Sequence, residues 1–166
     1  MKRVVIETMK EENEKRERQN NLVIYGVQES TREIPQERKT EDENFCNCKS
    51  LFLEGTMVNN VRIEQVIRLG RIQPEDQTGR PRPILVKLAS KTEKWSVLKN
   101  AKKLKYAARD EFKKAIIAPD LTAEERRHEK ELRERLWQKR NRGEEGWFIS
   151  NGELKQRRFL QREDQE

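Results

Sequence analysis

Short apolar runs bounded by Gly, Pro and charged residues alternate with amphipathic segments through the middle of the chain. Such runs are typical of strands, whereas apolar residues spaced three and four apart are typical of helices. The pattern predicts, in order, strand 22–27, helix 40–54, strands 61–72 and 84–90, helix 92–105 and strand 114–120. The order β-α-β-β-α-β predicts an α+β, ferredoxin-like fold, in which two helices cover one face of an antiparallel sheet and the other face stays open.

The first predicted helix begins with a local capping pattern. Thr40 and Glu43 have the spacing of a capping box, in which two side chains satisfy backbone N–H groups that the helix leaves unpaired. Gly55 ends the segment. The residues at helical spacing form an apolar face that we expect to be buried: Phe45, Cys48, Leu51 and Phe52.

The second predicted helix separates an apolar face from a basic one. Ser90 or Thr92 can cap its start. The apolar face consists of Val97, Leu98, Ala101 and Leu104. The same spacing leaves five lysines to solvent or to phosphate: Lys94, Lys99, Lys102, Lys103 and Lys105.

A charged segment precedes this central unit. Residues 1–19 contain helix-forming residues without Gly or Pro. Two interpretations stay open, the end of a coiled coil and a frayed charged helix, because few positions in the seam are apolar.

A second helix and a hairpin follow the central unit. Asp120 or Thr122 can cap a helix that ends near Arg142. Residues 147–155 surround Asn151-Gly152, a strong hairpin signal, and the last eleven residues are expected to be disordered. The sequence therefore predicts three parts: residues 1–19, 20–120 and 121–166.

Composition limits the size of the core and indicates a partner. Hydrophobic residues make up 33% of the chain and charged residues 40%, which favours a compact centre with charged extensions over one core spanning all 166 residues. The formal net charge is +7, and residues 61–118 carry 15 basic and 6 acidic side chains. A local excess of this kind attracts polyanions, because neutralised phosphates release their counterions. Nucleic acid is the expected partner.

Alternation along the strands assigns side chains to the two faces of the sheet. In residues 84–90, Ile84, Val86 and Leu88 should face the helices, so Lys87 faces outward. In the other strands the inward set is Leu22, Ile24, Ile63, Ile67 and Leu69, and the outward set is Val23, Tyr25, Val66 and Arg68.

The open face lacks the usual aromatic pair. RNA-recognition motifs stack bases on aromatic residues of strands one and three, but Val23 takes the first position and residues 84–90 contain no aromatic. Tyr25 can stack or pack. Binding is therefore expected to be mainly electrostatic, salt-sensitive and weakly specific, with these candidate residues: Tyr25, Arg68, Arg71, Arg80, Arg82, Lys87, Lys99, Lys102 and Lys103.

An ordered set of segments carries a family resemblance: RQNNLVIYGVQES, VIRLGR, RPILVKLAS, VLKNAKKLK and IIAPDLTAEER. Over about residues 18–155 the chain resembles the first-open-reading-frame proteins of LINE-type, non-LTR retrotransposons and, equally, the matching N-terminal segment of invertebrate retroelement proteins. The resemblance implies trimers formed through a longer coiled coil. It also implies a non-typical RNA-recognition domain and a C-terminal domain that bind single-stranded RNA with chaperone activity, and basic binding positions at Arg68, Arg71 and Lys130.

Catalysis, a cofactor and a membrane anchor are not expected. His128 is the only histidine, and the sequence lacks a nucleophile–base pair, a Gly-rich phosphate loop or a metal-ligand cluster. No apolar run has the length of a membrane span and no signal peptide is visible. Cys46 and Cys48 are expected to be reduced thiols of an intracellular protein, in a cytoplasmic ribonucleoprotein or in the nucleus. RNA and single-stranded DNA both remain open as ligands. The alternative functions are a protein-interaction or assembly scaffold and a non-catalytic N-terminal segment of a retroelement endonuclease or reverse transcriptase.

Overall fold

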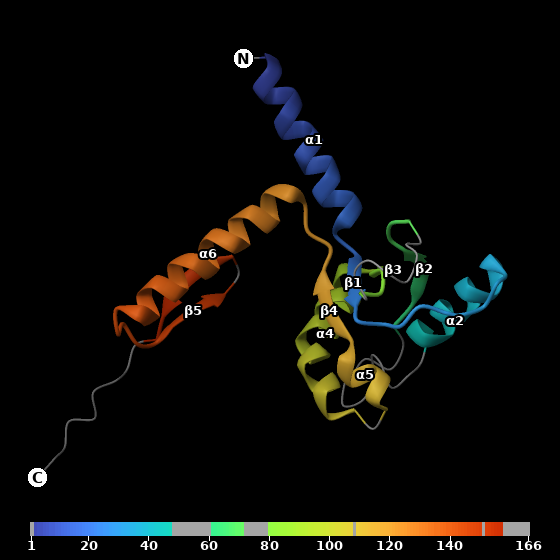
Figure 1. Ribbon diagram of the computed structural model, residues 1–166. Helices are drawn as coiled ribbons and strands as arrows, with labels where there is room; N and C mark the ends of the chain where they lie inside the picture. The colour runs from blue at the N-terminus through green and yellow to red at the C-terminus, as the bar shows by residue number, and fades with distance from the viewer. Residues whose placement is uncertain (1, 48–60, 72–79, 108, 151, 158–166) are drawn as a thin grey trace, which may run out of the picture. The chain divides into compact units, whose positions relative to one another are not determined.

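The chain is a mixed α+β protein with two compact units, Met1–Asp120 and Leu121–Glu166 (Figure 1). The computed structural model describes residues 2–47, 61–71, 80–107, 109–150 and 152–157. The first unit contains a four-stranded antiparallel sheet, and the second contains a helix and a two-stranded hairpin. Both sheets were predicted from the sequence, although several element bounds differ.

The sheet of the first unit has the strand order β2-β3-β1-β4. Its strands are β1 (Asn21–Tyr25), β2 (Ile63–Arg68), β3 (Ile84–Leu88) and β4 (Ile116–Pro119). Each neighbouring pair is antiparallel. The central strands β1 and β3 are more buried than the edge strands β2 and β4, as expected of strands that have a neighbour on both sides.

Helices cover one face of this sheet and close the core. They are α2 (Pro35–Asn47), α4 (Lys91–Asn100), the 3₁₀ helix η1 (Ala101–Tyr106) and α5 (Asp110–Lys114). Fully buried strand residues such as Leu22 and Val86 share one apolar cluster with Cys46, Val97 and Phe112 of the helices. A further helix, α1 (Lys2–Arg18), precedes β1.

The predicted facing of β2 is wrong in part. A register shift between Ile63 and Gln65 marks a β-bulge, so that Val66 pairs with Val86 and Arg68 pairs with Ile84. Val66 is therefore buried in the core, and Ile67, which was expected to face inward, is 41% exposed. One extra residue in a strand reverses the facing of every residue beyond it.

Helix α2 begins at Pro35, five residues before the predicted start. Proline suits the first turn of a helix because its missing N–H would have no partner there. Thr40 lies inside the helix, where its hydroxyl donates to the carbonyl oxygen of Gln36 at 3.0 Å, so the predicted capping box does not form. Cys46 is the fully buried cysteine of this helix; the expected apolar positions Cys48, Leu51 and Phe52 lie outside the described residues.

The segment between β3 and β4 contains more elements than predicted. The helix expected over residues 92–105 is α4 followed by η1, and the short helix α5 precedes β4, where the sequence predicted strand from residue 114. Ser90, one of the two candidate caps, caps α4: its hydroxyl accepts from the backbone N–H of Glu93, and the Glu93 carboxylate accepts from that of Ser90.

The second unit consists of α6 (Ala123–Asn141) and the hairpin of β5 (Trp147–Ser150) and β6 (Glu153–Gln156). Thr122 caps the helix and exchanges capping-box hydrogen bonds with Glu125. Ser150 pairs with Glu153 across the predicted tight turn. Lys139 lies 3.7 Å from the ring centroid of Trp147 and joins helix and hairpin through a cation–π contact.

No helix among the described residues combines the length and the apolar character that crossing a membrane requires.

Candidate nucleic-acid interface

The helices between β3 and β4 carry a concentration of basic residues. We call residues 91–114, which form α4, η1 and α5, the basic segment; it has nine basic and three acidic residues. Eight of the basic side chains are exposed: Lys91, Lys99, Lys102, Lys103, Lys105, Arg109, Lys113 and Lys114. Among the described residues, no carboxylate pairs with Lys99 or Lys102. The prediction that Lys99, Lys102, Lys103 and Lys105 are exposed is therefore confirmed.

Two aromatic side chains lie in the same segment and are mostly exposed. Trp95 is 57% exposed and Tyr106 is 77% exposed. The ammonium group of Lys105 lies 4.6 Å from the centroid of the Tyr106 ring. Sequence reasoning missed both residues because it searched the strands for aromatics. Helical spacing was the available signal, since Trp95 lies almost opposite the face formed by Val97 and Ala101.

The local sequence explains why the basic side of α4 faces outward. The capping box at Ser90 fixes the start of the helix, and Val97 and Leu104 pack into the core. Lys94 differs from the other lysines, because it is 6% exposed and its ammonium donates to the carbonyl oxygen of Arg18 at 3.2 Å. The expectation that Lys94 faces solvent or phosphate is wrong.

Arg68 of β2 lies on the helical side of the sheet and has a structural role. Its side chain is 8% exposed and forms an ion pair with Asp42 of α2 at 2.8 Å. The Nε group also donates to Asp42, and the remaining N–H groups donate to the carbonyl oxygens of Val27, Gln28 and Arg82. All five guanidinium N–H groups thus have acceptors. The prediction that Arg68 faces outward is wrong, and its guanidinium is engaged within the fold.

Arg82 is also engaged within the fold. Its guanidinium binds both carboxylate oxygens of Glu29, at 2.9 and 2.8 Å, and donates to the carbonyl oxygen of Gly70. This hydrogen-bonded pair lowers the pKa of Glu29 to about 2 and raises the pKa of Arg82. The interaction attaches the loop after β1 to the start of β3, which leaves Arg82 poorly placed to bind phosphate.

The other candidate residues are dispersed. Arg71 and Arg80 are exposed outside the regular elements. Lys87 is exposed on β3, as predicted, and lies 3.6 Å from Glu64. Lys130 belongs to α6 of the second unit and is exposed beside Glu134. Only the lysines of the basic segment form a local group.

The open face of the sheet is apolar. Tyr25 is 44% exposed and Ile116, its partner across the strands, is 65% exposed. Val23 faces the same side, between Leu85 and Ala118 of the neighbouring strands, and is 5% exposed. The charge on this face includes Lys87, which is paired with Glu64.

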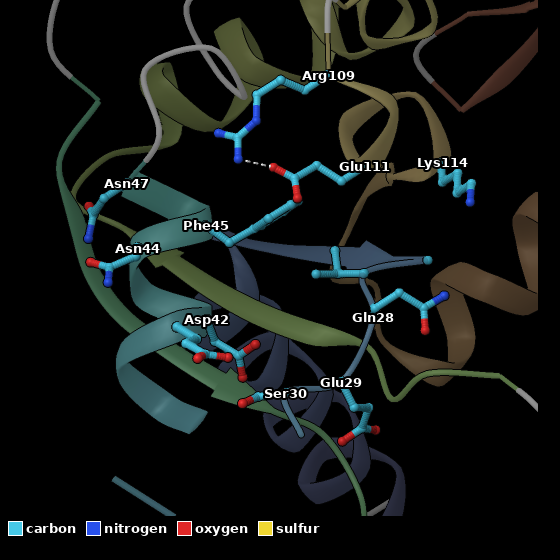
Figure 2. A pocket seen from close by; sticks show the side chains of 13 residues that line it. Gln28, Glu29, Ser30, Asp42, Asn44, Phe45, Asn47, Arg109, Glu111 and Lys114 are labelled. Carbon is cyan, nitrogen blue, oxygen red and sulfur yellow. Dashed lines mark ion pairs between the residues drawn. The ribbon is translucent and has the colours of Figure 1, made fainter. Parts of the chain in front are cut away.

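A pocket of about 790 Å³ lies on the helical side of the sheet, between the end of β1, α2 and α5 (Figure 2). Gly26 forms one wall with φ +80°, and a Cβ atom there would lie 2.4 Å from the carbonyl oxygen of Lys114. The four carboxylates of its lining each face a cation, in the pairs Asp42–Arg68, Glu29–Arg82, Glu41–Arg32 and Glu111–Arg109.

Each carboxylate of the pocket lining is therefore engaged by a cation. Phe45 packs against Phe112 at 5.2 Å between ring centroids and supplies an apolar floor. Within the described ranges, no group of three or more His, Cys, Asp or Glu residues could hold a metal ion. His128 lies in the second unit, where Nε2 is 3.0 Å from the carbonyl oxygen of Gly152.

Comparison with known proteins assigns no family. No model of a protein family matches the chain, and a search of curated proteins finds no significant match.

Proposed function

We propose that the chain binds single-stranded nucleic acid, RNA in the first instance, through the basic segment. The observation that carries the proposal is the set of exposed lysines interleaved with Trp95 and Tyr106 on one helical layer. Lysines attract the phosphate backbone, and exposed aromatic rings can stack on unpaired bases at roughly 1–3 kcal/mol per base. A duplex keeps its bases inside the stack, so the combination favours a single strand.

The proposal includes the class of the first unit. We infer an RNA-recognition-motif-type, ferredoxin-like domain that does not use its open sheet face for base stacking. The strand order β2-β3-β1-β4, with helices between β1 and β2 and between β3 and β4, supports this inference. A retrotransposon origin, an intracellular ribonucleoprotein and a non-catalytic role are parts of the same proposal and rest on the sequence resemblance.

Binding should be strongest where several neighbouring lysines can contact successive phosphates. Lys99, Lys102 and Lys103 lie within five consecutive positions at the junction of α4 and η1. Their long side chains can reach successive phosphates without a fixed base register. The expected result is binding with little sequence preference.

The experiment is fluorescence anisotropy with a labelled single-stranded oligonucleotide of mixed sequence. Replacing Lys99, Lys102 and Lys103 together by Ala should weaken binding at least about tenfold at 0.1 M salt, equally for different sequences. A matched control replaces three exposed cations elsewhere, Lys10, Arg16 and Lys39, and should change affinity by less than about threefold. Equal losses in both triple variants would mean that net charge alone, and not this surface, determines binding.

Stacking has its own test. Trp95→Ala should weaken binding about fivefold or more, whereas Trp95→Phe should retain most of the affinity. Trp137 of the second unit is 65% exposed, compared with 57% for Trp95, and Trp137→Ala is the control for loss of a surface aromatic. Duplex of the same sequence should bind less tightly than the single strand.

An assembly scaffold is the second candidate function. The exposed side chains Tyr25, Ile67 and Ile116 on the open sheet face favour it. Failure to bind any oligonucleotide at low salt would leave this candidate in place of nucleic-acid binding.

A further inference from the structure

The pocket between α2 and α5 adjoins the basic segment (Figure 2). Helix α5 is the last part of that segment and contributes Arg109, Glu111 and Lys114 to the lining, and α2 contributes Asn44 and Phe45. The volume of about 790 Å³ lies within the range of small-molecule sites, roughly 300–1,000 Å³. A strand bound along the basic segment therefore reaches a cavity that can hold a group of ligand size.

The surface of this pocket is rich in acceptor oxygens. Its lining contains four carboxylates, whereas three of the cations that pair with them, Arg32, Arg68 and Arg82, are not part of the lining. A ligand inside the pocket therefore meets carboxylate oxygens, which accept hydrogen bonds but do not donate them. Such a surface suits a ligand that carries N–H groups and does not suit a phosphate, so the phosphates of a bound strand should remain with the exposed lysines.

Side-chain amides and flat groups complete the lining. Gln28, Asn44 and Asn47 line the pocket, and within the described residues their amide groups have no hydrogen-bond partner. Each amide offers both donors and an acceptor. Phe45 is partly buried and supplies an apolar surface, and the guanidinium of Arg109, 4.9 Å from the ring centroid of Phe112, is a plane on which an unpaired base can stack.

A nucleobase with an exocyclic amino group matches this combination of groups. Cytosine presents an amino donor where uracil presents a carbonyl oxygen, and a carboxylate recognises only the amino group. Glu41 and Glu111 are the available carboxylates, since each contacts its cation through one oxygen and a carboxylate can accept about four hydrogen bonds. The lining therefore distinguishes these two pyrimidines, which are of similar size.

We propose that the pocket binds one unpaired base of the bound strand and favours a base with an exocyclic amino group, such as cytosine, over uracil. The inference rests on the proposed function and adds to it. Lysines hold phosphates without regard to sequence, and the base in the pocket adds a preference at a single position of the strand. Lys114, an exposed cation of the lining, lies where it can contact the phosphate next to that base.

Fluorescence anisotropy with labelled oligo(C) and oligo(U) of about ten nucleotides tests the preference at neutral pH. Oligo(C) should bind at least about fivefold more tightly. Glu41→Gln combined with Glu111→Gln should reduce this ratio below about twofold, because an amide can donate to the carbonyl oxygen of uracil; both side chains are 47% exposed, so circular dichroism should show unchanged folding. The matched control, Glu37→Gln with Glu43→Gln, removes the same charge from α2 outside the lining and should leave the ratio unchanged.

NMR spectroscopy locates the base in the complex with oligo(C). The side-chain amide signals of Gln28, Asn44 and Asn47 should shift, whereas that of Gln36, on α2 outside the lining, should not. Shifts confined to α4 and η1 would overturn the proposal. Equal affinities for oligo(C) and oligo(U) with a steep salt dependence would also overturn it, but would leave the proposed function in place. Absence of binding to both oligonucleotides would overturn the proposed function and this inference with it.

Discussion

The ion pair between Arg68 and Asp42 should be one of the largest side-chain contributions to the stability of the first unit. Asp42→Ala removes the carboxylate that pairs with Arg68 and leaves the guanidinium 8% exposed, with three carbonyl acceptors but without its ion-pair partner. Removing one partner of a buried pair costs about 3–5 kcal/mol. That loss is a large share of the 5–15 kcal/mol typical of a domain.

The assay is urea unfolding followed by the fluorescence of Trp95 in a background with Trp137→Phe and Trp147→Phe, so that the signal comes from the first unit. The control is Lys87→Ala, which breaks the pair with Glu64 on the open face, where both side chains are nearly half exposed. Exposed pairs contribute about 0–1 kcal/mol, so the control should unfold almost like the unchanged chain. A cost below about 1 kcal/mol for Asp42→Ala would refute the reasoning, because it would mean that the Arg68 guanidinium is adequately solvated.

Replacing both Arg68 and Asp42 by apolar residues should not restore the stability of the unchanged chain. Arg68→Met, even combined with Asp42→Leu, leaves the carbonyl oxygens of Val27, Gln28 and Arg82 without their donor. The double variant should therefore remain at least about 1–3 kcal/mol less stable than the unchanged chain. Recovery of full stability in the double variant would show that these hydrogen bonds contribute little.

Two further predictions follow from shifted pKa values. Because Arg82 lowers the pKa of Glu29 to about 2, the pair should stabilise the fold above the ordinary carboxyl pKa near 4.5 and lose that contribution as the pH falls toward 2; urea midpoints between pH 5 and pH 2 should fall less steeply in Glu29→Gln. Burial raises the pKa of the Cys46 thiol to about 12, so in a Cys48→Ser background it should resist a thiol reagent at pH 8 until urea unfolds the chain; rapid labelling of the folded chain would contradict its burial.

Helix boundaries show what local sequence could and could not predict. Ser90 and Thr122 were each one of two candidate caps in the sequence, and each forms a capping box with a partner three residues away, at Glu93 and Glu125. Thr40 and Glu43 have the same spacing but lie within α2. The local pattern permits a cap at either place, and the earlier start at Pro35 allows Asp42 to lie under β2, where it meets Arg68.

The alternation of apolar and polar residues could not predict the bulge in β2. Ile63, Ile67 and Leu69 have the alternation of one strand face, but the shift between Ile63 and Gln65 places Val66 in the core instead. A regular strand and a bulged one have the same composition. The choice is made by packing against β3 and α2.

The candidate site could be predicted only where its residues are set by local sequence. The lysines of the basic segment were identified from the apolar face of α4, which local spacing reveals. Arg68 and Arg82 were misassigned because their partners, Asp42 and Glu29, lie 26 and 53 residues away in the sequence. Positive charge alone does not distinguish an arginine that binds a ligand from one that holds two loops together.

The most direct test of the nucleic-acid proposal is the salt dependence of binding to a single-stranded oligonucleotide. The logarithm of the binding constant should fall linearly with the logarithm of salt concentration, at about 0.7 per neutralised phosphate. The Ala variant of Lys99, Lys102 and Lys103 should have a slope smaller by about 2, with the Lys10, Arg16 and Lys39 control unchanged. A flat slope for the unchanged chain, or the same steep slope in the Lys99, Lys102 and Lys103 variant, would contradict binding through the basic segment.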